Sequence, residues 1–100
     1  MSDNALDFLV GWFAAHCNDD WEHDTGIRIE TLDNPGWAID IRTEDTELEG
    51  VIVDWQRTED DDTWLHWRST GLAFEARCGP GDLQLALLSF RTFAESHARC

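Results

Sequence analysis

The stretch IRIETLDNPGWAIDI, residues 27–41, decides how the fold begins. Apolar and polar residues alternate in 27–32 and again in 37–41, a pattern typical of strands that bury one face. Between the two runs, proline presets φ at one turn position and glycine accepts a positive φ at another. The stretch therefore predicts a β-hairpin. Its turn and the start of its second strand form one structural motif, made of Asp33, Asn34, Pro35, Gly36 and Trp37.

Three more alternating runs follow the hairpin, at 51–57, 63–69 and 72–78. In the first of these runs, Val53 and Trp55 are expected to share one face, since side chains alternate along a strand. Consecutive strands are joined by short links. Such links favour an antiparallel sheet of about five strands, arranged as a meander.

Helices are expected on either side of these strands, at 4–16 and 82–96. In the first, apolar residues recur at helical spacing and His16 completes their stripe. Asp82 can serve as the N-cap of the second, whose apolar stripe includes Phe90. Both helices are expected to pack on one face of the sheet, which leaves the other face partly open. The sequence thus predicts a single α+β domain over residues 1–100.

The charge of the chain is strongly one-sided, with 21 acids, seven arginines, no lysine and a net charge of −14. Phosphates and anionic membranes would be repelled, so neither nucleic acid nor a membrane is an expected partner. A cationic partner is expected instead, although acid can also serve solubility alone. The N-terminus, MSDNALDF, lacks the basic region of a secretion signal, so a cytoplasmic location is expected.

Residues 16–26, HCNDDWEHDTG, concentrate the reactive side chains. Their spacing lacks the paired ligands of a zinc site and misplaces the glycine and glutamate of an EF-hand loop. Cys17 and His23 could serve as nucleophile and base of a small thiol enzyme. The neighbouring acids disfavour a thiolate, so no catalytic residue, metal or cofactor is expected. The three cysteines form no CxxC pair, which is typical of reduced thiols.

Twelve of the 21 acids fall in three groups of four, at 19–24, 44–49 and 59–62. They form either a solvated rim or a surface for a cationic partner. Because antiparallel strands alternate in direction, the first two groups are expected to converge and the third to lie at the other end. Trp21 is expected to anchor the partner or to clamp its own loop. The candidate partner-binding residues are Asp19, Asp20, Trp21, Glu22, Asp24, Glu44, Asp45 and Glu47.

The run CNDDWEHDTGIRIETLDNPGWAIDI, residues 17–41, resembles the signature of the immunity protein 53 family of bacterial polymorphic toxin systems. The matching features are Cys17-Asn18, Asp20-Trp21-Glu22-His23, Gly26-Ile27 and the seven residues from Thr31 to Trp37. The resemblance implies a small cytoplasmic protein, not an enzyme, that binds and neutralises a cognate toxin. Such toxins are often nucleases and therefore basic. From the residues alone, an acidic regulatory module and a thiol enzyme remain the alternatives, and the oligomeric state stays open.

Overall fold

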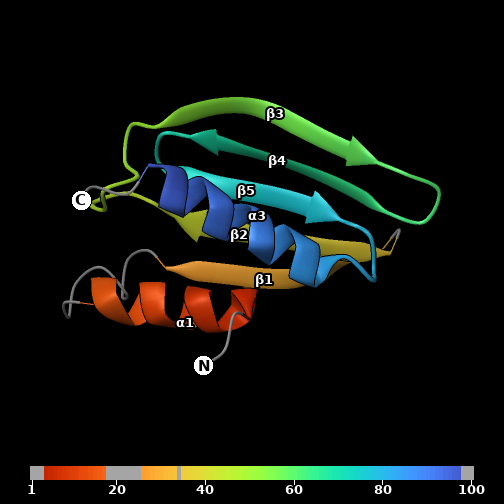
Figure 1. Cartoon of the computed structure of the whole chain (residues 1–100), viewed down its shortest axis with the longest axis horizontal. Coiled ribbons are helices and arrows are strands. Elements are labelled where there is room, and N and C mark those ends of the chain that lie inside the picture. The colour runs from red at the N-terminus through yellow and green to blue at the C-terminus, as the bar shows by residue number, and fades with distance from the viewer. Residues whose placement is uncertain (1–3, 18–25, 34, 98–100) are drawn as a thin grey trace.

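The computed structural model describes residues 4–17, 26–33 and 35–97. They form two helices and one five-stranded sheet, in which α3 lies across the sheet and α1 runs beside β1 (Figure 1). The elements are α1 (Ala5–His16), β1 (Ile27–Leu32), β2 (Gly36–Arg42), β3 (Ile52–Glu59), β4 (Trp64–Thr70), β5 (Ala73–Cys78) and α3 (Leu83–Ser96).

The strands pair in the order β1-β2-β5-β4-β3, and every neighbouring pair is antiparallel. The α+β class and the five antiparallel strands between two helices are confirmed, but the simple meander is wrong. β2 pairs with β5 instead of β3, so the β1–β2 hairpin and the β3–β4–β5 meander join side by side. The chain reaches β3 through a crossover loop (residues 43–51) at one end of the sheet (Figure 1).

The composition of the strands explains this order. In β5, Phe74, Ala76 and Cys78 are fully buried on one face, and Ala73 is almost buried on the other. Such a strand can be flanked by other strands on both sides. β3 is exposed along nearly its whole length and carries acids and an arginine. Charged side chains are costly to bury and protect a free edge against other strands, so β3 lies at an edge of the sheet.

Both helices pack on the same face of the sheet, as expected. The ring of Trp12 from α1 meets the ring of Phe90 from α3 edge to face, with centroids 5.1 Å apart. Phe90 in turn packs on Phe74 of β5 at 5.2 Å. These aromatic contacts join the helices and the sheet into one core. Among the described residues, no helix is long and apolar enough to cross a membrane.

The hairpin motif ties β2 to β5 and to the turn before α3. Gly36 is not among the described glycines with positive φ, so the expected reason for this glycine is wrong. Glycine is needed because a Cβ at this position would overlap the carbonyl oxygen of Cys78. Beside it, Nε1 of Trp37 donates a hydrogen bond to the Pro80 carbonyl at 3.0 Å. Asn34 of the motif lies outside the described residues.

The register between β3 and β4 shifts between Val53 and Gln56. A bulge adds a residue and reverses the alternation of side chains beyond it. Trp55 therefore lies on the face away from the helices, and the expectation that it shares the face of Val53 is wrong. There, the guanidinium carbon of Arg68 lies 4.9 Å from the centroid of the Trp55 ring, and Trp55 is 40% exposed.

Asp82 precedes α3 as expected, but its side chain makes no capping hydrogen bond. Its Oδ2 accepts a hydrogen bond from the backbone N–H of Trp64 at 3.1 Å instead. The backbone N–H of Gly79 also donates to the Trp64 carbonyl, at 3.1 Å. The turn before α3 is therefore joined to the start of β4 by two hydrogen bonds.

Candidate functional site

The crossover loop is held to the fold at both ends and in the middle. The backbone N–H of Thr43 donates to the Leu72 carbonyl at 3.0 Å, and that of Gly50 donates to the Gly71 carbonyl at 2.7 Å. Between these bonds, Leu48 is 0% exposed and belongs to the hydrophobic core. The loop is therefore a fixed part of the fold, and its acids occupy defined positions.

Two of the predicted acids in this loop are involved in local contacts. Oε1 of Glu44 lies 3.1 Å from Nη2 of Arg42, at the end of β2. Asp45 adopts a left-handed φ of 65°, which aspartate tolerates better than most residues. Its backbone N–H donates to Oε1 of Glu49 at 2.7 Å, while the Asp45 side chain stays exposed. The loop thus orders its own acids and presents them at the surface.

The third predicted acid, Glu47, connects the loop to α1. Its Oε2 lies 2.8 Å from Nε2 of His16, the last residue of the helix. The other ring nitrogen of His16, Nδ1, donates to the Trp12 carbonyl at 2.8 Å, because a carbonyl can only accept. The His16 ring also packs against Trp12 in a tilted arrangement, with centroids 4.4 Å apart. His16 therefore connects the end of α1 to the crossover loop.

Both described flanks of segment 18–25 lie beside the crossover loop. His16 contacts it on one side, and on the other the Gly26 carbonyl accepts a hydrogen bond from the N–H of Arg42 at 2.9 Å. The five predicted residues within this segment, Asp19, Asp20, Trp21, Glu22 and Asp24, lie outside the described residues. The third acid group, at 59–62, lies at the turn between β3 and β4, at the far end of the sheet (Figure 1).

The sheet face away from the helices carries most of the basic charge. Of the six arginines that the structure describes, five lie on this face. In one cross-strand row, Arg28 of β1, Asp40 of β2, Glu75 of β5 and Arg68 of β4 are successive partners. The face thus alternates arginines with acids, in contrast to the acidic loops at its ends. The five arginines are Arg28, Arg42, Arg57, Arg68 and Arg77.

None of these residues was singled out from the sequence. Arg28, Arg68 and Arg77 fall at polar positions of alternating runs, and that signal alone indicates only a solvated face. The strand order is needed to bring the arginines together. Arg28 and Arg68 belong to the same cross-strand row only because β5 lies beside β2.

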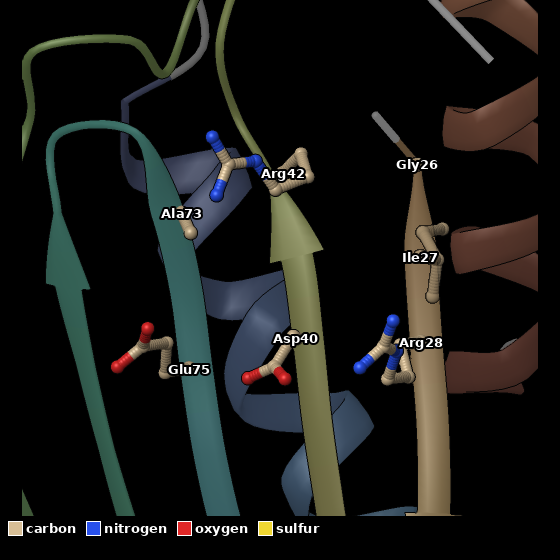
Figure 2. Close-up of a pocket in the computed structure, with 7 residues that line it drawn as sticks. All are labelled: Gly26, Ile27, Arg28, Asp40, Arg42, Ala73 and Glu75. Carbon is tan, nitrogen blue, oxygen red and sulfur yellow. The ribbon is translucent and has the colours of Figure 1, made fainter. Parts of the chain in front are cut away.

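A pocket of about 410 Å³ opens on this face between β1, β2 and β5 (Figure 2). Figure 2 shows the guanidinium group of Arg28 directed over the sheet toward Asp40, and that of Arg42 directed toward Ala73. Glu75 lies on β5, and its carboxylate is directed away from Asp40. The pocket is lined by Gly26, Ile27, Arg28, Asp40, Arg42, Ala73 and Glu75.

The two acids of the pocket are already paired with arginines outside it. Oδ1 of Asp40 lies 3.2 Å from Nη1 of Arg77, and Oε1 of Glu75 lies 2.8 Å from Nε of Arg68. Arg28, by contrast, has no ion pair within 4.0 Å in the part of the chain that the structure describes. The pocket therefore holds neutralised acids and a guanidinium group with donors to spare.

Two cysteines, Cys17 and Cys78, lie among the described residues. Burial, reinforced by the Asp82 carboxylate, raises the pKa of the Cys78 thiol to about 11, so this thiol is protonated at neutral pH. Cys17 is exposed, and its Sγ lies 3.3 Å from the Phe13 carbonyl. His23, its expected base, lies outside the described residues. In the described ranges, no group of three or more histidine, cysteine or acidic side chains could hold a metal ion.

Comparison with known proteins identifies one family. A family model described as Immunity protein 53 matches residues 6–95, which include every helix and strand except the ends of α1 and α3. No curated protein and no solved structure gives a significant match.

Proposed function

Since this chain belongs to the immunity protein 53 family, it is an immunity protein, and we propose that its target is a basic toxin held through its acidic loops. The toxin is the product of the same polymorphic toxin system, and a nuclease is the class that best fits an acidic inhibitor. The protein acts by binding in the cytoplasm and not by catalysis. Asp19, Asp20, Trp21, Glu22, Asp24, Glu44, Asp45 and Glu47 form the proposed contact surface.

The observation that carries this proposal is the fixed acidic crossover loop. Like charges placed close together repel one another, so an ordered acidic loop has an unfavourable energy that a basic partner can relieve. The burial of Leu48 and the contact between His16 and Glu47 keep this loop in place. A surface that is already ordered loses little conformational entropy on binding.

The charge of the whole chain supports the basic toxin. A net charge of −14 attracts a cationic partner over distances of about a Debye length and repels nucleic acid. An enzyme that binds phosphates presents basic residues around its active site, because phosphate contacts are made largely by lysine and arginine. An acidic inhibitor is complementary to such a surface.

Co-expression with the toxin encoded beside this chain tests the proposal. Cells that produce the toxin together with this chain should grow, whereas cells that produce the toxin alone should stop growing. A variant with Asp20 and Glu22 both changed to Lys should protect less well than one with Asp60 and Asp61 changed to Lys, which carries the same charge change at the far end of the sheet. If the wild-type chain gives no protection and binds no toxin, the proposed function is wrong.

A further inference from the structure

We propose that the pocket on the open sheet face receives a carboxylate side chain of the toxin, so that this inference rests on the proposed function and adds a second contact to it. The occupant is a short segment of the toxin that presents one aspartate or glutamate to Arg28 and Arg42. The acidic loops and this pocket would then contact different parts of the same partner.

The first support is the distribution of charge. In a chain with a net charge of −14, five of the six described arginines gather on one face of the sheet. That face is not covered by either helix, because α1 and α3 both pack on the opposite face. Arginine and tryptophan dominate the energetically important positions of protein interfaces.

The second support is the state of the charged groups in the pocket. Asp40 and Glu75 are neutralised by Arg77 and Arg68, which lie outside the lining. A guanidinium group carries five N–H donors in a planar fork that matches the two oxygens of a carboxylate. Arg28 has no ion pair among the described residues, and the one ion pair described for Arg42 uses its Nη2. Both guanidinium groups therefore retain donors for an incoming carboxylate.

The surroundings favour a single carboxylate over a phosphate or a second cation. A phosphate carries more negative charge than a carboxylate and would lie next to Asp40 within a strongly acidic molecule. A cationic side chain would meet Arg28 and Arg42 without a free acid to bind. Ala73 adds apolar surface for the methylene groups of an aspartate or glutamate. The volume of about 410 Å³ accommodates more than one side chain, which suits a short segment of protein.

Such a pocket would give specificity that the acidic loops cannot give. Long-range attraction accelerates association with any basic protein, whereas a charge of the opposite sign at one defined position selects among them. A basic protein without an acid at that position would leave Arg28 unpaired in the interface. A polar or charged group that is buried without a partner weakens binding substantially.

Calorimetric titration with a catalytically inactive form of the toxin encoded beside this chain tests the inference. Arg28→Glu should weaken binding at least tenfold, since it places a third acid in the pocket and repels the incoming carboxylate. Arg28→Gln, which removes the charge and keeps most of the shape, should weaken binding less. Arg57→Glu is the matched control, with the same charge change on the same face but on the opposite edge strand. It should change the affinity less than threefold.

The outcomes separate the two proposals. If the wild-type chain does not bind the toxin, the proposed function and this inference fall together. If the wild type binds and a folded Arg28→Glu variant binds equally well, only the pocket inference is wrong. An equal loss in the Arg28→Glu and Arg57→Glu variants also overturns it, because general charge would then explain the effect. The acids of the toxin can also be changed to lysine one at a time. One of these toxin variants should bind the Arg28→Glu chain more tightly than it binds the wild-type chain.

Discussion

Cys78 shows how the fold controls the chemistry of one residue. It lies fully buried at the end of β5, between Trp37 and Leu65 on the neighbouring strands. Burial is the main reason that its pKa rises to about 11, and the nearby Asp82 carboxylate contributes to this rise. A thiolate is the reactive form of cysteine, so this side chain is a core residue and a poor nucleophile at neutral pH.

The raised pKa of Cys78 predicts a loss of stability at alkaline pH. The ordinary pKa of the thiol is 9.0 and that in the folded chain is about 11, so between these values the folded state keeps a proton that the unfolded state has lost. The free energy of unfolding should therefore fall as the pH rises from about 9 to about 11, by an amount on the order of 2 kcal/mol. Below pH 9 this contribution is fully present. Urea unfolding at a series of pH values measures it.

The composition of the chain reduces the number of other groups that titrate between pH 9 and 11. The chain has no lysine and no tyrosine, the two side chains that normally titrate in the same range. Cys78→Ala should lower the stability below pH 9 because it leaves a cavity, but it should flatten the slope between pH 9 and 11. Leu48→Ala is the control, since it also leaves a cavity but removes no titrating group, so the slope should stay intact. An unchanged slope in Cys78→Ala would contradict the assignment.

At the scale of elements, the crossover loop is the decisive segment. It lets β3 pair with β4 at the far edge, while β2 pairs with β5. It also fills the end of the core with Leu48 and meets α1 through the contact of Glu47 with His16. Ser69 of β4 fixes its last residue, since its hydroxyl donates to the Val51 carbonyl at 2.6 Å. A segment that looks like a polar link in the sequence is thus a structural element of the fold.

Truncation of Leu48 should therefore be costly. Leu48→Ala removes a fully buried side chain and should lower the free energy of unfolding by about 3 kcal/mol, the usual cost of such a change in a core. Leu88→Ala is the matched control, because Leu88 of α3 is 44% exposed, and it should cost less than about 1 kcal/mol. Urea denaturation of both variants measures the difference. Equal, small effects would show that the loop does not contribute to the core.

At the scale of the molecule, charge is segregated. The acidic crossover loop lies at one end of the sheet and the acids of 59–62 lie at the other (Figure 1), while arginines occupy the open face between them. An excess of acid of this size speeds association with a cation, and salt weakens that effect by screening. The acidic ends of the sheet can therefore attract a partner at long range, while the arginines of the open face can select the partner at short range.

The association rate with the toxin should therefore depend on salt and on the position of the acids. Raising the ionic strength from about 0.01 M to about 0.15 M should slow association severalfold or more, because the Debye length shortens from about 30 Å to about 8 Å. Reversal of both Asp20 and Glu22 to Lys should slow association more than reversal of both Asp60 and Asp61. Stopped-flow mixing measures both effects. Equal rates in the two folded double variants would indicate that net charge alone steers the encounter.

The sequence by itself determined the local structure, because the spacing of apolar residues distinguishes a helix from a strand. It predicted the bounds of both helices and all five strands to within one or two residues. The motif at 17–41 also indicated the family. Tertiary structure alone decided that β5 lies beside β2, that Gly36 is required by the Cys78 carbonyl, and that a bulge turns Trp55 outward. These features depend on which strands can be flanked by other strands on both sides and on contacts between residues far apart in the chain. The arginine face and its pocket exist only once those contacts have formed, so no local pattern could have revealed them.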